Sequence, residues 1–250
     1  MAKQLAVILL ALMTTACTTT NPDDTALSRV GVNGTTLAYA TFGEGQPVLL
    51  IHGNGGSHHD LDTLAYQLSD AGYRVYAPDT RGHGANAPLE EYHYADMAED
   101  MYQFCEQLHI EQPIVYGWSD GGIIALMLEM AHPGTVKAMV VSGANIYPGK
   151  RLDTLYDDTF FGDIDLDDPL EAMMYYEPDL EAEDLGAIAC PVLVTAGSDD
   201  LIPEPHTRLI ADAIPNTELL ILPGEDHFSY IVGSKKIGDI MLNYLSLQSF

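Results

Sequence analysis

Apolar residues in this chain gather into short runs that show no polar alternation. Six such runs lie between positions 47 and 222, at 47–51, 73–77, 113–116, 138–142, 191–196 and 218–222. An apolar run of this length is typical of a strand that is buried on both faces, as strands in a parallel sheet are. The runs therefore predict six strands of a parallel sheet.

Segments with helical periodicity alternate with these runs, at 61–71, 95–109, 120–131, 206–214 and 235–245. Before the first run, alternating residues within 28–42 flank Asn33-Gly34, a strong turn signal for a β-hairpin. Strands and helices alternate over the rest of the chain. We therefore predict one α/β domain at residues 28–250, with a doubly wound, mostly parallel sheet of about eight strands.

One interval, at about 147–186, interrupts the alternation because it is too long for a single crossover helix. It contains thirteen acidic residues, from Asp153 to Asp184, and its bases are Lys150 and Arg151. We predict a short acidic cap inserted after the sixth strand, with a helical piece at 170–176. Such a cap would cover the carboxyl ends of the strands, where α/β sheets bind ligands.

The beginning of the chain has a different pattern. Met1-Ala2-Lys3-Gln4 precedes an apolar stretch at 5–13, which ends in Thr14-Thr15-Ala16-Cys17. The stretch is shorter than the ~20 residues of a membrane-spanning helix, and it ends in small residues that suit cleavage. We predict a secretory signal peptide at residues 1–16, followed by a polar tether at 17–27.

Cys17 directly follows Thr15-Ala16, and this arrangement resembles a bacterial lipobox. Thr14 departs from the leucine that the motif usually has three residues before the cysteine. The resemblance implies an exported protein that a lipid on Cys17 anchors to a bacterial envelope membrane. The alternative is ordinary cleavage after Ala16, which would leave Cys17 as a free thiol.

Charge and cysteine content narrow the function further. The chain has 37 acidic and 10 basic side chains, a formal net charge of -27, which repels the phosphates of nucleic acids. Binding to nucleic acid is therefore excluded as a function, and the acidity equally suits a solubility role. Cys105 and Cys190 are either a pair of buried thiols or a disulfide that export would permit.

The strongest candidate for chemistry is a serine between glycines. Gly117-Trp118-Ser119-Asp120-Gly121 joins a predicted strand to a predicted helix, and it matches Gly-x-Ser-x-Gly, a strained turn that exposes the serine hydroxyl. A serine nucleophile needs a base and a carboxylate that orients the base. His227 follows the strand at 218–222, and Asp199-Asp200 follows the strand at 191–196. All three positions should meet at the carboxyl edge of the sheet.

Three motifs together resemble those of α/β-hydrolase-fold serine hydrolases. His52-Gly53-Asn54-Gly55-Gly56 resembles the oxyanion-hole turn, and Asp79-Thr80-Arg81-Gly82-His83-Gly84 resembles the Asp-x-Arg-Gly-x-Gly loop. Gly117-Trp118-Ser119-Asp120-Gly121-Gly122 resembles the elbow of the valacyclovir-hydrolase-like esterase branch. The resemblance covers nearly all of the chain after the tether and implies the α/β-hydrolase fold.

The resemblance also implies roles for single residues. Ser119 would be the nucleophile, and His227 would be the general base and then the general acid. The orienting acid would be Asp199 or Asp200. We predict Asp200, because the family commonly places this acid three residues after the glycine that ends the strand, here Gly197.

Two further predictions concern the surroundings of Ser119. The backbone amides of Asn54 and Asp120 would form the oxyanion hole. Trp118 is a candidate substrate-binding residue because it adjoins the serine, although packing in the core explains it equally well. We expect no metal, because adjacent histidines such as His58-His59 project differently and no typical zinc spacing occurs.

These features predict a cofactor-free serine hydrolase that cleaves small carboxylic esters through an acyl-enzyme. The acidic cap adds the hypothesis of a cationic substrate, such as an amino-acid ester. One alternative keeps the triad and changes the reaction to carbon–carbon bond hydrolysis or cofactor-free perhydrolysis. Another is a non-catalytic surface binding lipoprotein.

Overall fold

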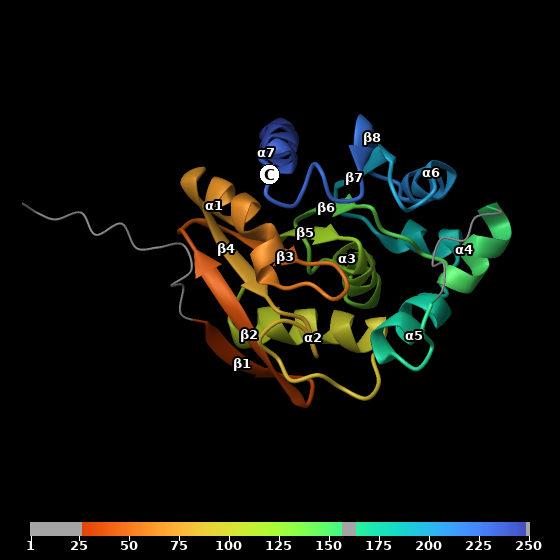
Figure 1. Cartoon of the computed structure of the whole chain (residues 1–250). Helices are drawn as coiled ribbons and strands as arrows, with labels where there is room; N and C mark the ends of the chain where they lie inside the picture. Colours follow the sequence, from red (N-terminus) through yellow and green to blue (C-terminus); the bar gives the residue numbers. More distant parts are fainter. Residues whose placement is uncertain (1–26, 157–163, 249–250) are drawn as a thin grey trace, which may run out of the picture.

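The computed structural model describes residues 27–156 and 164–248, which form eight strands in one sheet (Figure 1). The strands are β1 (Ser28–Val32), β2 (Thr35–Phe42), β3 (Gln46–Ile51), β4 (Tyr73–Pro78), β5 (Ile114–Trp118), β6 (Ala138–Ser142), β7 (Val192–Asp199) and β8 (Thr217–Asp226). Their order is β1-β2-β4-β3-β5-β6-β7-β8. β2 is antiparallel to β1 and β4, and the remaining pairs are parallel. The predicted mostly parallel sheet is confirmed.

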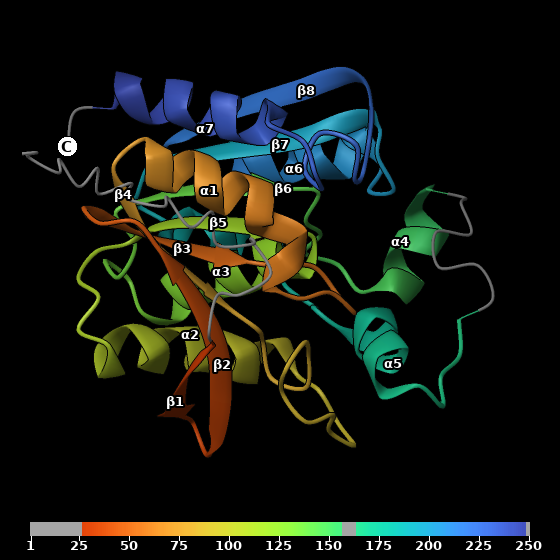
Figure 2. The same cartoon turned by 60° about the vertical axis from the view of Figure 1, so that its left-hand side comes forward.

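Helices cover both faces of the sheet. α1 (Asp62–Asp70) and α7 (Lys236–Leu247) lie on one face, and α2 (Tyr94–Gln107), α3 (Asp120–Ala131) and α6 (Glu204–Ala213) lie on the other (Figure 2). Successive strand residues enter the two cores alternately: Val48 and Leu50 of β3 pack toward α1, whereas Leu49 and Ile51 pack toward α3. A strand between two apolar layers needs apolar residues at every position, which explains the uninterrupted runs.

The last strand is longer than the sequence pattern predicts. The apolar run ends at Leu222, but β8 continues to Asp226 beside β7, which continues to Asp199. The register of this pair shifts between Gly197 and Asp199, so that Asp199 pairs with Asp226. An irregularity of this kind bends and twists the strands. His227 therefore follows the strand directly, without an intervening loop.

The cap lies between β6 and β7 and consists of α4 (Gly149–Tyr156), α5 (Pro169–Tyr176) and a short 3-10 helix, η3 (Ala182–Ala187). α5 corresponds to the predicted helical piece. The Asp168 carboxylate caps it by accepting hydrogen bonds from the amides of Leu170 and Glu171, and Pro169 occupies its first turn. In Figures 1 and 2 the cap helices project beyond the carboxyl ends of the central strands.

The predictions for the N-terminal segment, including lipidation of Cys17, fall outside the described residues. Within residues 27–156 and 164–248, no helix combines the length and apolar character needed to cross a membrane. Cys105 and Cys190 are free thiols, and both are buried. Burial raises the pKa of each thiol to about 12. The sequence left open whether these cysteines form a disulfide or remain a pair of buried thiols, and in the structure they are buried thiols.

A buried ion pair attaches α2 to the loop that follows β4. The Arg81 guanidinium donates two hydrogen bonds to the Asp100 carboxylate, from Nε at 2.7 Å and from Nη2 at 2.6 Å. The Asp100 side chain is fully buried, whereas Asp96, which Arg81 also contacts at 3.3 Å, is half exposed. A bidentate pair of this kind fixes both position and orientation.

Replacing Arg81 with methionine should lower the free energy of unfolding by about 3–5 kcal/mol, because the Asp100 carboxylate would stay buried without its cationic partner. Urea unfolding followed by circular dichroism measures the loss. Asp96→Asn is the matched control and should cost less than about 1 kcal/mol, since that carboxylate is solvated. A loss below about 1 kcal/mol for Arg81→Met would contradict this account.

Candidate active site

Ser119 occupies the turn between β5 and α3 with φ 54° and ψ −120°, a strained conformation for a residue with a side chain. Its amide donates a 2.8 Å hydrogen bond to the Ser142 carbonyl at the end of β6. The flanking glycines are required sterically. A Cβ atom would lie 2.2 Å from the Gly121 carbonyl oxygen if placed on Gly117, and 2.0 Å from the Ile51 carbonyl oxygen if placed on Gly121. The structure thus has the turn that the motif predicts.

His227 and Asp200 form a buried pair at the ends of β8 and β7. The distance from His227 Nδ1 to Asp200 Oδ1 is 2.7 Å, and the two side chains are 6% and 1% exposed. Asp200 also accepts hydrogen bonds from the amides of Ile202 at 2.9 Å and Gly197 at 3.3 Å. An ionised carboxylate only accepts, so Nδ1 carries the proton and Nε2 is the basic nitrogen. Asp199 is exposed, and the structure therefore brings Asp200 against the histidine.

Gly143 provides the space for this pair, a role that the sequence analysis did not identify. It follows β6 with φ 59°, and a Cβ atom there would lie 2.8 Å from His227 Cε1 and 3.3 Å from Asp200 Oδ2. In the sequence, Gly143 stands out only as a glycine directly after a predicted buried strand. Many turns have a glycine at this position, so the sequence does not indicate that Gly143 packs against His227 and Asp200.

The predicted oxyanion turn lies against Ser119. A Cβ atom on Gly53 would be 3.2 Å from the Ser119 Cβ, so Asn54 follows a residue that touches the serine. His52 holds this turn: its Nε2 accepts a 3.0 Å hydrogen bond from the Thr80 amide, and its Nδ1 donates to the Gly53 carbonyl at 2.7 Å. Burial lowers the pKa of His52 to about 4, so the ring is neutral at neutral pH.

A second buried pair ties the segment just after this turn to the loop after β4. Asp79 Oδ1 accepts hydrogen bonds from the His58 amide at 2.8 Å and from the His58 ring at 2.7 Å, while Oδ2 accepts from the Ala85 amide at 2.8 Å. These hydrogen bonds outweigh burial and lower the pKa of the Asp79 carboxyl. His58 thus has a structural partner, and the described residues contain no cluster of three or more potential metal ligands.

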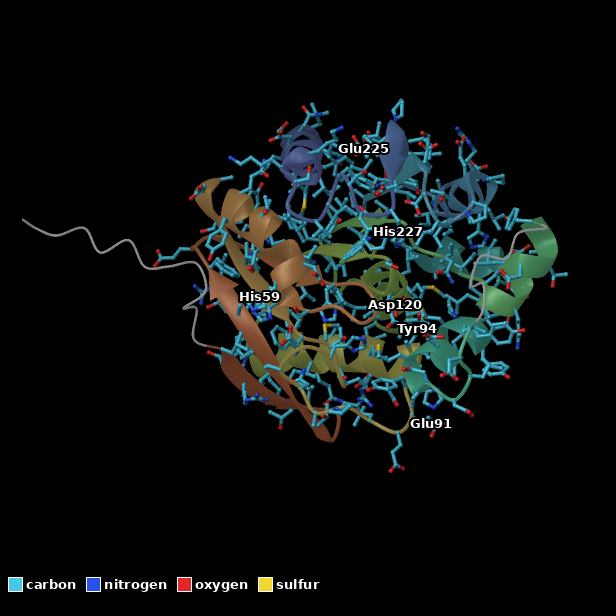
Figure 3. All side chains as sticks on the ribbon, viewed as in Figure 1. His59, Glu91, Tyr94, Asp120, Glu225 and His227 are labelled. Carbon is cyan, nitrogen blue, oxygen red and sulfur yellow. The ribbon has the colours of Figure 1, made fainter. Side chains whose placement is uncertain are left out.

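Two cavities meet at Ser119 and His227. The first, of about 330 Å³, extends toward Tyr94, Asp120 and Asn145, and the second, of about 400 Å³, extends toward the 53–55 turn, Trp118 and Phe228. Glu171 and Met174 of the cap helix α5 line both cavities, so the cap roofs the serine as predicted. Figure 3 shows His227, Asp120 and Tyr94 grouped near the carboxyl ends of the central strands.

The Asp120 side chain is an unexpected feature of the first cavity. It is 5% exposed, and its Oδ1 accepts a 2.8 Å hydrogen bond from the Tyr94 hydroxyl. Its Oδ2 is also buried and, in the part of the chain that the structure describes, makes no hydrogen bond of normal geometry, while the nearby Asn54 side chain acts to lower the pKa of the carboxyl. Burial raises the pKa of this carboxyl to about 6. A buried oxygen at a cavity wall that lacks a hydrogen bond of normal geometry is suited to a ligand that donates a hydrogen bond or carries positive charge.

Sequence reasoning considered only the backbone amide of Asp120, and it missed Tyr94. Asp120 is an acidic residue at the start of the apolar stretch 120–131, and this position could have indicated a functional role for its side chain. Tyr94 lies on α2, 26 positions away, and no local pattern connects the two. Their contact depends on how α2 packs against α3.

Residues 46–166 match a family model described as alpha/beta hydrolase fold. The chain is 29% identical to the serine hydrolase BPHL of Homo sapiens over 231 residues, which cover 80% of this chain and 79% of that protein. The corresponding protein of Mus musculus is 27% identical over the same coverage.

Solved structures agree with the fold. The esterase EaEST of Exiguobacterium antarcticum superposes with a TM-score of 0.73 at 21% identity, over 88% of this chain and 99% of that one. A meta-cleavage product hydrolase, CumD of Pseudomonas fluorescens, superposes with a TM-score of 0.71 at 20% identity, over 88% and 97%. At these identities the two structures bear on the fold alone.

Replacing Gly143 with alanine should displace the imidazole of His227 from the Asp200 carboxylate, because the new Cβ would overlap the ring. The proton on His227 Nδ1 should lose its downfield NMR resonance or shift it strongly upfield. Gly134→Ala is the matched control: Gly134 also has a positive φ, of 87°, but nothing lies within 4 Å of its added Cβ. Gly134→Ala should lose about 1 kcal/mol of stability and Gly143→Ala should lose more because of the overlap, and only Gly143→Ala should change the resonance. An unchanged resonance in Gly143→Ala would refute this packing role.

Proposed function

We propose that the chain cleaves small carboxylic esters through an acyl-enzyme on Ser119, because residues 46–166 match the alpha/beta hydrolase family model and serine hydrolases are among its relatives. The observation that carries the proposal is the meeting of Ser119 and His227 at one cavity, with Asp200 hydrogen-bonded behind the histidine. Nucleophilic catalysis by serine requires a base beside the hydroxyl and a group that orients the base, and His227 and Asp200 are suited to these two roles.

The proposed reaction proceeds in two halves. His227 Nε2 accepts the hydroxyl proton of Ser119 as the serine oxygen attacks the ester carbonyl, whose π electrons move onto its oxygen. The tetrahedral intermediate collapses, and the departing alcohol takes the proton from His227. Water then repeats the sequence on the acyl-enzyme and releases the carboxylic acid. Asp200 stabilises the transient imidazolium and keeps its own charge throughout.

The negative oxygen of the intermediate needs fixed donors. The amides of Asn54 and Asp120 are the proposed pair, since the first follows Gly53 against the serine and the second begins α3. The positive end of the α3 dipole adds stabilisation at the same point. Losing one such donor typically raises the barrier by ~2.7–4 kcal/mol.

The first cavity favours a substrate with a positive charge near its acyl group. Asp120 Oδ2 is buried there with no hydrogen bond of normal geometry, and Glu171 of the cap lines the same space. Partly desolvated carboxylates attract an ammonium group more strongly than solvated ones do. An α-amino ester, with its ammonium group close to the scissile carbonyl, fits this arrangement.

Fluorophosphonate labelling and turnover of a p-nitrophenyl ester test the nucleophile. Wild-type protein should label and turn over, whereas Ser119→Ala should do neither. Asp200→Asn should lower kcat by about 10⁴-fold, because the histidine would lose its orienting charge. Asp199→Asn, the neighbouring exposed carboxylate, should stay within about twofold of wild type.

Two outcomes would count against the proposal. Labelling that persists in Ser119→Ala would remove the serine assignment. The other outcome is a protein that labels at Ser119, turns over no ester and hydrolyses a vinylogous diketone. This outcome would show that the same residues catalyse carbon–carbon bond hydrolysis.

The preference for a cationic substrate should depend on pH. Since burial raises the pKa of Asp120 to about 6, the carboxylate takes up a proton and loses its charge as the pH falls through that value. The ratio of kcat/KM for a valine ester to kcat/KM for the matched 3-methylbutanoate ester should fall about five- to tenfold between about pH 7.5 and about pH 5. It falls because the loss of charge on Asp120 outweighs the gain of charge on the substrate amino group, whose pKa is about 7.7–8.0. Taking the ratio cancels any effect of pH on the catalytic steps that the two substrates share. A ratio that is constant with pH, or equal to one throughout, would exclude this role of Asp120.

A further inference from the structure

Trp118 lies where three parts of the candidate active site meet. It is the last residue of β5, directly before Ser119, and it is the only tryptophan in the chain. Its side chain is 6% exposed and packs in the core between the sheet and helices α1 and α7. A Cβ atom on Gly53 would lie 3.4 Å from Trp118 Cε3, so the indole also borders the oxyanion turn.

The indole reaches the backbone of the histidine. Trp118 Nε1 donates a buried hydrogen bond of 3.0 Å to the His227 carbonyl oxygen, across 109 positions of sequence. The two rings are also neighbours, with centroids 5.8 Å apart and planes inclined by 46°. Phe228 packs its ring edge-on against the indole at 5.5 Å. One side chain thus touches the residue on each side of the peptide bond that follows His227.

The other contacts of this segment have different effects. The Asp226 carboxylate accepts hydrogen bonds from the amides of Phe228 and Ser229, which shape the turn locally. Asp200 holds the imidazole from the side of β7. Neither contact connects the backbone of His227 to β5, the strand that ends directly before the serine. The hydrogen bond from Trp118 makes this connection. Because the indole is rigid, it holds the His227 carbonyl at a fixed distance from β5.

We propose that Trp118 is a positioning residue that sets the placement of His227 relative to Ser119, an inference that rests on the proposed function. The indole N–H fixes the His227 carbonyl, and the ring supports the imidazole so that Nε2 faces the serine. A misplacement of about 1 Å between reacting groups can cost about 10²-fold in rate. If the His227 carbonyl loses this donor it stays buried without a hydrogen bond, which costs free energy, so the backbone shifts to a position where the carbonyl finds another partner.

Because the chain has one tryptophan, replacing this amino acid during expression alters Trp118 alone. 3-Benzothienylalanine keeps the shape of the indole but has sulfur in place of the N–H, and 5-fluorotryptophan keeps the N–H and is the matched control. The benzothienyl protein should show kcat for a p-nitrophenyl ester lowered about 10- to 100-fold, with KM within about threefold of wild type. The fluorotryptophan protein should keep both constants.

The rate of fluorophosphonate labelling at Ser119 is the second measurement, and it should fall in parallel with kcat in the benzothienyl protein. The labelling rate also distinguishes a failure of the proposed ester hydrolysis from a failure of the positioning role of Trp118. If wild-type protein labels at Ser119 but hydrolyses no ester, the proposed reaction is wrong and the labelling rate still tests Trp118. Wild-type kcat and labelling rate in the benzothienyl protein would overturn the positioning role, and so would an increase in KM alone, which would make Trp118 a substrate contact.

Discussion

The close approach of the Ser119 turn to the neighbouring strand is the constraint on which the site depends. β5 turns into α3 so sharply that its glycines touch backbone atoms, including the Ile51 carbonyl of β3. Any side chain at Gly117 or Gly121 would push the helix away from the sheet. The contact keeps Ser119 in its strained conformation, and it places the first turn of α3 beside the turn that follows β3. Stored strain of this kind persists because both apolar cores hold the surrounding elements in place.

The sheet brings the other groups to this point with little help from the loops. Turn 52–56, Ser119, Gly143, Asp200 and His227 follow the carboxyl ends of five strands that are adjacent in the order β3-β5-β6-β7-β8. Neighbouring parallel strands end side by side, so groups that are distant in sequence become close in space. The geometry of the site is therefore as rigid as the sheet. The cap, which covers both cavities, contributes walls and charge.

The parallel strands of the sheet could be predicted from the sequence, because strands with two buried faces consist of continuous apolar runs. The end of β8 could not be predicted, since Pro223-Gly224 is a turn signal and the extension depends on the register shift against β7. Ser119 and the two regions with the acid and the histidine were predictable from motifs at strand ends. The contact of Asp200 with His227, the Tyr94–Asp120 hydrogen bond and the space at Gly143 depend on the packing of separate elements. No periodicity within one segment encodes such contacts.

The insertion point of the cap has an evolutionary consequence. The cap leaves the sheet after β6 and returns at β7, and these strands are paired from Met139–Val192 to Ser142–Thr195. The two strands that flank the insertion are therefore held side by side by sheet hydrogen bonds, at a separation of about 4.8 Å, whatever the intervening residues are. Lengthening or exchanging this segment changes the roof and leaves the register beneath it intact, at a small entropic cost. A change in the cap can thus alter the walls of both cavities while the strand ends that carry Ser119, Asp200 and His227 stay in place.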